Sequence, residues 1–524
     1  MTAGPAPRAA RLGTSGSRTA SMAGLCGLLV IAVSVVTVLR YTGPHLHADG
    51  VMQSVMSLQG VELFFWGQNR FLSVVPFLAS PITDPDANLF ACLLLNALSF
   101  HALLLLLAWM GVHVVTGRRS RPDVLVLFLL LAATTHLVVT PYQIYTAALD
   151  SQPYSLSWLL MLGGFLLWKR APGWAWGAAA AAAGLAAGLN QSVVLGAAFL
   201  ALIEAVRRRQ WRRWLLFGTV WIGWLGAWFV LAARFGRTDA VAAGMSTSYY
   251  GFEPDRFLGG LGESIGAVIG AFSTGWLIAA AAAAGLSTTL LDRARRAALL
   301  RRFGLLALFS AGYLILFAGN PWIAANNYPA RYYFPVLVGV VVCLAAPITA
   351  GLSVATRRWA GRPGGRPNRW MTPSVVATTV AGALAAAAIA GPLTAPARSW
   401  IFQDVRPTAQ FAMATDTSFV AGDYWVVWPL TDRLLAAGRP ALAANYKAGG
   451  DPSRYGHRMD DLLSVGVTPR ALCLNDSPDS CAGQLDRWTR PGWRTVPDAV
   501  CPVAEPPPYA DTAERSCQVL EFRG

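Results

Sequence analysis

Long apolar runs recur along the whole chain, and they limit it to one class of fold. A helix needs about 20 mostly apolar residues to cross the hydrocarbon core of a bilayer. Eleven crossings are expected, at 22–39, 88–115, 122–140, 154–168, 173–189, 192–206, 214–233, 264–290, 303–319, 333–351 and 374–392. Hydrophobic residues make up 55% of the 524 residues and charged residues only 13%. The sequence therefore predicts an all-α polytopic membrane protein with a transmembrane domain at 22–393.

Arginine clusters predict how the chain is oriented. Alternate loops carry GRRSR, WKR, RRRQWRR, DRARRAALLRR and RRWAGRPGGRPNR. The positive-inside rule places these loops in the cytoplasm, together with the N-terminal tail 1–21, whose composition is typical of disorder. The first outer loop 40–87 and the segment 394–524 then lie outside a bacterial cytoplasmic (inner) membrane. The net charge of +15 collects in the inner turns without a recognition motif, so we expect no nucleic-acid partner.

The segment 394–524 is predicted to be an extracytoplasmic α/β domain. Its apolar density falls, and short strand-like runs alternate with helical stretches. It also holds four of the seven cysteines, Cys473, Cys481, Cys501 and Cys517. Four cysteines in an oxidising compartment predict two disulfides. Three pairings are open, and pairing of sequence neighbours (473 with 481, 501 with 517) is the default expectation.

Polar residues in the outer loops are the candidate functional groups, because ionisable side chains near a bilayer are costly. Asp49 follows the first span and opens an amphipathic stretch that is typical of an interfacial helix. His45, His47 and Asp49 alternate, so an extended backbone would offer them together to a divalent metal such as Mg or Mn. The other candidates are Gln68, Asn69, Arg70, Asp150, Gln152, Arg331 and Tyr332. Walker and GxSxG motifs do not occur, which argues against ATP-driven transport and serine hydrolysis.

Four stretches resemble a known family of membrane enzymes, the GT-C glycosyltransferases. HADGVMQSVMSLQGVELFFWGQNRFLSVVPFLASPI resembles their first outer loop, and NNYPARYYFPVLVGV resembles a late outer loop. LDSQPYSLSWLLMLGGFLLWKR and GLAAGLNQSVVLGAAFLALIEAVRRR resemble the spans that follow the first loop. The resemblance covers most of 20–395 and extends to enzymes that use polyprenyl-phosphate-linked sugars, such as dolichyl-phosphate-mannose and aminoarabinose transferases. Two departures are visible. Many relatives carry adjacent acids where this chain has Ala-Asp-Gly, and some carry a lysine where it has Asn190-Gln191.

The resemblance implies transfer of a sugar from a polyprenyl phosphate to a cell-envelope glycan or lipid acceptor. Asp49 would then be the catalytic base, Arg70 and Arg331 would meet the phosphate, and Asp150 with Gln152 would bind the sugar. Alternatives stay open for each residue. Asp49 is also a suitable helix N-cap, and arginines also snorkel to lipid headgroups. Asp150 with Gln152 could instead only end a helix before Pro153. A lipid-linked sugar flippase and a non-catalytic envelope-assembly protein remain the rival functions.

Overall fold

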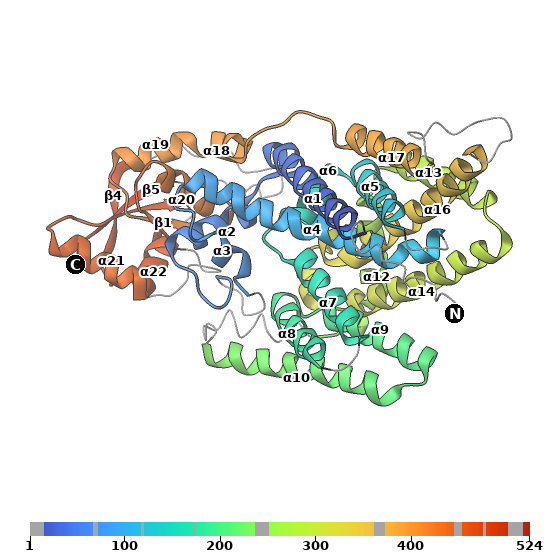
Figure 1. Cartoon of the computed structure of the whole chain (residues 1–524). Helices are drawn as coiled ribbons and strands as arrows, with labels where there is room; N and C mark the ends of the chain where they lie inside the picture. Colours follow the sequence, from blue (N-terminus) through green and yellow to red (C-terminus); the bar gives the residue numbers. More distant parts are fainter. Residues whose placement is uncertain are drawn as a thin grey trace, which may run out of the picture.

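The computed structural model describes residues 15–66, 72–116, 120–170, 173–235, 251–360, 373–444, 453–474, 478–500 and 517–523. A bundle of long helices forms one end of the molecule, and a small sheet covered by helices forms the other (Figure 1). The bundle helices are α1 (Ser15–His45), α4 (Pro85–Thr116), α5 (Arg121–Val138), α7 (Tyr154–Trp168), α8 (Trp174–Leu189), α9 (Val193–Arg208), α10 (Trp211–Phe235), α13 (Thr274–Thr289), α14 (Arg293–Ala318), α16 (Phe334–Ala360) and α17 (Pro373–Ile389).

Six helices in the described part of the chain are long and apolar enough to cross a membrane. They lie at Gly24–His45, Pro85–Thr116, Arg121–Val138, Trp211–Leu231, Arg293–Ala318 and Ala330–Trp359. Three shorter apolar helices accompany them, at Tyr154–Trp168, Trp174–Leu189 and Ser374–Ile389. The chain is thus a multi-pass membrane protein by helix length and composition, whereas the total of eleven crossings stays a prediction.

The predicted span 264–290 is wrong, because two helices replace it. Three residues separate the end of α12 (Phe257–Gly270) from the start of α13. The intervening backbone bonds to the segment after α5: the amide of Thr140 donates to the carbonyl of Ala271 at 2.9 Å, and the amide of Ser273 donates to the carbonyl of Val138 at 2.8 Å. These bonds satisfy peptide groups that a continuous helix would have paired internally, so the helix can stop there.

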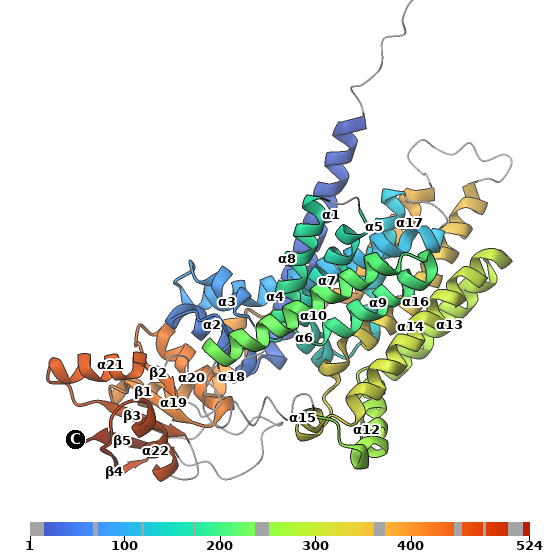
Figure 2. The ribbon, with the colours of Figure 1, turned by 90° about the horizontal axis from the view of Figure 1, so that it is seen from below.

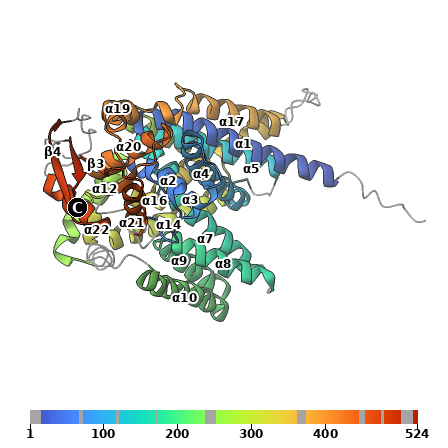
Figure 3. The ribbon, with the colours of Figure 1, turned by 90° about the vertical axis from the view of Figure 1, so that its left-hand side faces the viewer.

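The bundle closes on itself and has two distinct ends. Seen from the sheet side, α17 lies beside α1 and α5, so its last helix packs against its first (Figure 3). Turning the molecule shows the N-terminal end of α1, the α9–α10 turn and the α13–α14 turn at the end away from the sheet (Figure 2). The two arginine-rich turns thus share one end of the bundle, as the predicted orientation requires.

The amphipathic stretch after α1 does form a helix, α2 (Ala48–Gln59), but its predicted interfacial position is wrong. Every residue from Ala48 to Ser57 is buried. α2 packs against α3 (Val74–Ala79), α4 and α20 (Tyr424–Ala436). Its polar face therefore meets protein instead of lipid headgroups.

The C-terminal segment folds as a five-stranded sheet in the order β2-β1-β3-β5-β4, with helices between most strands. The strands are β1 (Phe419–Gly422), β2 (Leu442–Ala444), β3 (Arg470–Leu474), β4 (Trp493–Val500) and β5 (Cys517–Phe522). β1 runs parallel to β2 and β3, while β5 is antiparallel to β3 and β4. The helices of this segment are α18 (Trp400–Asp404), α19 (Arg406–Ala414), α20, α21 (Ser453–Ser464) and α22 (Pro478–Trp488).

One predicted disulfide is present and ties β3 to α22. Cys473 pairs with Cys481. Cys517 is also disulfide-bonded, and Cys501 lies outside the described residues. The predicted neighbour pairing is therefore observed for its first half.

Candidate functional site

Asp49 is the second residue of α2 and lies two residues after His47, which occupies the N-cap position. The carboxylate of Asp49 is therefore not the cap of its own helix. The next residue must be small: a Cβ at Gly50 would overlap the hydroxyl of Tyr145 from α6 (Pro141–Ala148). The Asp-Gly pair thus lets α2 start directly against the α6 segment, with the carboxylate turned towards residues from other parts of the chain.

Arg331 brings two acids together. It lies in the short 3-10 turn η2 (Ala330–Tyr333), directly before α16. Its Nη1 atom lies 3.6 Å from Oδ2 of Asp49 and 3.6 Å from Oδ2 of Asp150, which follows α6. The side chains of Arg331, Asp49 and Asp150 are only 15%, 13% and 0% exposed. A single buried cation is thus shared between carboxylates that lie about 100 residues apart in sequence.

Arg331 has an N–H donor that is not hydrogen-bonded to any described residue. Its distances to the two acids are longer than those of good N–H···O bonds, so the contacts are ion pairs. Its Nε atom is buried and has no hydrogen-bond partner among the described residues. A guanidinium presents five donors in a planar fork that matches a phosphate. The arginine therefore keeps at least one N–H donor that no described residue accepts.

Tyr424 reaches this site from the sheet segment. Its hydroxyl donates to Oδ1 of Asp49 at 2.5 Å. The approach is set locally: Gly422 ends β1 at φ +123°, where a Cβ would overlap the carbonyl of Leu474 in β3. Asp423 then caps α20 by accepting from the amide of Trp425 at 2.8 Å. The strand end, the glycine and the cap together place Tyr424 at the first turn of α20, facing α2.

Burial and neighbouring charges set the protonation of these groups. Burial, reinforced by the Asp49 carboxylate and opposed by Arg331, raises the pKa of Asp150 to about 7. Burial lowers the pKa of His47 to about 4, so its imidazole is neutral at pH 7. Burial and then the Asp49 carboxylate raise the pKa of Tyr424 well above its usual value, so this phenol stays a proton donor. The site therefore holds one cation, one neutral imidazole and two carboxyls of which one titrates near neutrality.

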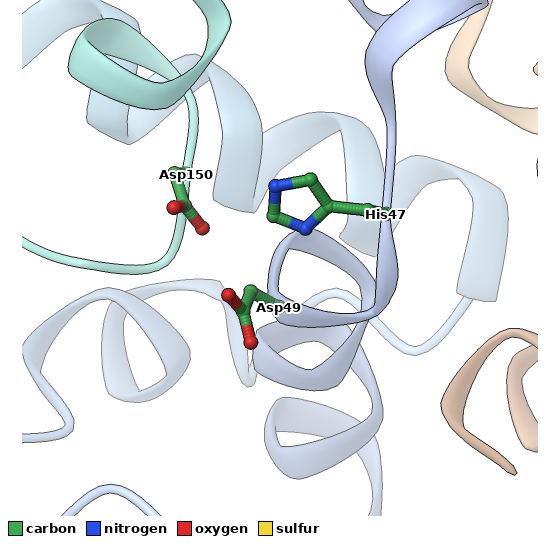
Figure 4. A group of neighbouring side chains, drawn as sticks. All are labelled: His47, Asp49 and Asp150. Atoms are coloured by element: carbon green, nitrogen blue, oxygen red, sulfur yellow. The ribbon is translucent and has the colours of Figure 1, made fainter. Parts of the chain in front are cut away.

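Three of these side chains form a possible metal site. Ligand atoms of His47, Asp49 and Asp150 all lie within 4.8 Å of one another, and Figure 4 shows the three side chains pointing towards one another. Carboxylate oxygens and a neutral imidazole are suitable ligands for a divalent cation. His45, the other histidine of the predicted set, packs its ring against Tyr142 at 6.0 Å instead. The structure thus replaces His45 by Asp150 in the donor set.

The remaining predicted residues have diverse positions. Gln152 accepts a hydrogen bond from the hydroxyl of Tyr154, two residues on. The ring of Tyr332 lies 5.6 Å from the guanidinium carbon of Arg331, and its hydroxyl accepts from Nε1 of Trp322 at 3.2 Å. The predicted phosphate and sugar contacts Gln68, Asn69 and Arg70 lie outside the described residues.

Three supporting residues, Gln53, Asn96 and Tyr424, were not predicted from the sequence. Asn96 of α4 donates to Oε1 of Gln53 at 3.0 Å and to the carbonyl of Leu149 at 3.2 Å. It therefore ties α2 to the residue before Asp150. One signal was available, because Gln53 follows Asp49 by four residues and so lies on the same face of a helix. Tyr424 gave no comparable signal, since an aromatic cluster in this segment reads as hydrophobic core.

Comparisons with known proteins place the chain next to two solved structures. The sequence matches no known family model and no curated protein. The structure is similar to ArnT from Cupriavidus metallidurans, solved bound to undecaprenyl phosphate, with a TM-score of 0.46 and 14% identity over 97% of this chain and 98% of that one. It is also similar to the arabinosyltransferase EmbB from Mycobacterium smegmatis, with a TM-score of 0.36 and 14% identity. In that case the match covers 83% of this chain but only 42% of EmbB.

Proposed function

We propose that this chain is an integral-membrane glycosyltransferase. It transfers a sugar from a polyprenyl-phosphate donor to a cell-envelope glycan or lipid acceptor on the outer face of the cytoplasmic membrane. The observation that carries the proposal is the convergence of Asp49, Asp150 and Arg331 on one buried site. A shared cation with uncommitted donors, next to a carboxylate, suits a reaction in which one group loses a proton and another leaves as a phosphate.

Asp49 acts as the general base. Its carboxylate takes the proton of the acceptor hydroxyl while the acceptor oxygen bonds to the anomeric carbon of the sugar. The bond between that carbon and the phosphate oxygen breaks in the same step, and its electron pair leaves with the polyprenyl phosphate. A single displacement of this kind needs one base, and Asp49 is the more exposed of the two acids, at 13% against 0% for Asp150.

Arg331 stabilises the leaving phosphate. Negative charge grows on the departing oxygen, and a donor fixed in a water-poor site stabilises such charge far better than a donor in water. The ion pairs of Arg331 with the two acids hold its guanidinium in place, and its Nε is bonded to none of the described residues. Forked hydrogen bonds from arginine to phosphate are the strong, charge-assisted kind.

Tyr424 and Asp150 hold the base in position. The Tyr424 hydroxyl fixes Oδ1 of Asp49, and Arg331 fixes Oδ2, so the carboxylate has one orientation. Asp150 pairs with the same Nη1 atom of Arg331 and so also holds the guanidinium. Gln152 and Tyr332 lie next to these groups in sequence, and we assign them, with Gln68, Asn69 and Arg70, to binding of the sugar and the phosphate. A divalent cation held by His47, Asp49 and Asp150 would add positive charge for the same phosphate.

Transfer of radiolabelled sugar from polyprenyl phosphates in native membranes tests the proposal. We expect Asp49→Asn to lower the rate by about 100- to 10,000-fold, the usual contribution of a general base. Asp255→Asn is the matched control, because Asp255 is an exposed acid. Equal transfer by wild type and the Asp49 variant, at equal amounts of folded protein, would remove Asp49 from the mechanism.

The rival functions make different predictions. A flippase would move the lipid-linked sugar across the bilayer without a labelled product, and an assembly protein would do neither. A flippase is expected to carry polar groups along its mid-membrane helices. The polar residues that the sequence places there largely contact neighbouring side chains. His101 and His136 stack at 5.9 Å and contact Ser34 and Tyr41, while Glu204 pairs with a lysine. A non-catalytic assembly protein would be favoured if Asp49 faced lipid. The Asp49 carboxylate instead contacts Arg331 and Tyr424.

A further inference from the structure

A hollow lined by arginines lies at the turn between α9 and α10, far from the candidate active site. Its volume is about 550 Å³, and its lining residues are Arg209, Gln210, Trp211, Arg212 and Arg213. The turn is tight, with Arg209 in the left-handed region at φ 53°. It lies at the end of the bundle away from the sheet (Figure 2).

The base of the hollow is fixed. The guanidinium of Arg213 donates to the carbonyls of Trp168 and Arg170 at the end of α7, the latter at 2.6 Å. In return, Nε1 of Trp168 donates to the carbonyl of Arg213 at 3.3 Å. Trp168 itself stacks on Trp176 at 4.8 Å. Arg213 therefore holds the α9–α10 turn against the end of α7.

Two arginines of the hollow carry a positive charge that no ion pair in the described part of the chain neutralises. The nearby carboxylate is Glu204, which pairs with Lys169 at 2.8 Å and with Arg207 at 3.6 Å. Among the described residues, no carboxylate pairs with Arg209 or Arg212. Both side chains are exposed. The hollow thus presents two unneutralised guanidinium groups beside an acid that is already committed elsewhere.

Exposed apolar side chains lie next to the lining residues of the hollow in sequence. The apolar window of α10 begins at Trp211, so the hollow lies at the end of a membrane-spanning segment. Val206 of α9 is 61% exposed and Leu215 of α10 is 65% exposed. Trp211 is 48% exposed, as tryptophans at a membrane–water interface often are. Exposed arginines and exposed apolar side chains therefore lie three residues apart in sequence, at the end of a helix apolar enough to cross a membrane.

We propose that this hollow binds the headgroup of an anionic phospholipid. Arg209 and Arg212 meet the phosphate, and the acyl chains lie along Val206 and Leu215. Basic pockets between membrane helices bind acidic headgroups in this way. The site is separate from the proposed transfer reaction and does not depend on it, because none of its residues belongs to the group around Asp49.

The test counts lipids bound to the purified, detergent-solubilised protein by native mass spectrometry. Phosphatidylglycerol is titrated against wild type, Arg209→Gln/Arg212→Gln and the matched control Arg301→Gln/Arg302→Gln, which removes two exposed arginines from α14. Each arginine near a headgroup contributes about fivefold in affinity, so the first variant should bind its tightest lipid about 30-fold more weakly. The control should bind as wild type does. Arg212→Gln alone, with an expected loss of about fivefold, serves if the double variant does not fold.

Two further ligands identify the source of the anion. Phosphatidylcholine should bind more weakly than phosphatidylglycerol, and soluble glycerophosphate should not displace the lipid at equal concentration. The proposal is overturned if the Arg209/Arg212 variants retain wild-type affinity, or if phosphatidylcholine binds equally well. Displacement by glycerophosphate would instead identify a site for a soluble anion and would equally overturn the lipid assignment.

Discussion

Asp150 is a fully buried carboxyl whose protonation should change near neutral pH. Burial favours its neutral form, and the Asp49 carboxylate beside it acts in the same direction. Arg331 opposes both, since its Nη1 lies 3.6 Å from Oδ2 of Asp150. The balance leaves the pKa of Asp150 at about 7 in the folded protein, compared with an ordinary value of 3.8.

This difference makes folding stability depend on pH. The folded chain holds the Asp150 proton more tightly than the unfolded chain, so stability contributed by this proton falls as the pH rises from 3.8 towards 7. Between these two pH values the free energy of unfolding contributed by this proton falls by about 4 kcal/mol, at about 1.36 kcal/mol for each tenfold change in proton affinity. About 2 kcal/mol of this should be lost between about pH 5.5 and about pH 8.5.

Infrared spectroscopy of protein carrying isotope-labelled aspartate would follow this proton directly. We expect one buried carboxyl to lose its proton near pH 7 in wild type, and Asp150→Asn to remove that transition. Asp49→Asn should move it to lower pH, because the neighbouring like charge is gone. Thermal unfolding of the same samples should show a wild-type midpoint that falls with pH more steeply than that of Asp150→Asn.

Asp255→Asn controls for the loss of an aspartate as such, since this exposed side chain lies outside the site. The electrostatic reasoning would be refuted by a wild-type protein without a carboxyl that titrates between pH 6 and 8. It would equally be refuted if the transition persisted in Asp150→Asn or did not respond to Asp49→Asn.

Three further changes test the framework of the site. Tyr424→Phe removes a hydrogen bond to a charged acceptor and should lower the sugar-transfer rate about tenfold or more, with the KM for the donor unchanged. Gly50→Ala introduces a Cβ against the hydroxyl of Tyr145 and should cost about 1 to 3 kcal/mol of stability, and adding Tyr145→Phe should recover part of it in thermal unfolding. Cys473→Ser opens a disulfide between residues eight apart and should cost about 2 to 3 kcal/mol, measured by unfolding with and without reductant.

Each of these changes has a distinguishing outcome. Tyr455→Phe removes another hydrogen-bonded phenol of the same segment, which donates to the carbonyl of Ala443, and it should affect stability but not the KM or rate of transfer. A Tyr424→Phe enzyme with wild-type turnover would show that the hydroxyl is dispensable for the base. Additive losses in Gly50→Ala and Tyr145→Phe would contradict the proposed overlap. Equal unfolding of wild type and Cys473→Ser without reductant would show that the disulfide adds no stability.

Helices were predictable from the sequence because their signal is local. Most apolar runs became helices close to the expected bounds, as at Tyr154–Trp168, because each run contains its own hydrogen-bond partners. The apolar run at 264–290 was wrongly predicted to be one helix. Its break depends on a distant segment, in which Val138 and Thr140 supply backbone hydrogen-bond partners for Ser273 and Ala271. No periodicity within 264–290 records that contact.

The site was predictable only in part, and for a similar reason. Asp49 and Arg331 could be singled out because few ionisable residues fall in the predicted outer loops. Their approach to each other follows from helix packing, which the order of the spans does not specify. Tyr424 could not be assigned, because its hydroxyl finds Asp49 only after β1, Gly422 and the start of α20 have assumed their positions.

The contact between Tyr424 and Asp49 also has a consequence in time. The two residues are 375 positions apart, so the ribosome has completed the predicted membrane spans before it reaches the phenol. At a synthesis rate of roughly 5 to 20 residues per second, roughly 20 to 75 s pass between the synthesis of Asp49 and that of Tyr424. A nascent chain therefore inserts and packs in the bilayer with this pair unmade, and the contact can form only as biosynthesis nears its end.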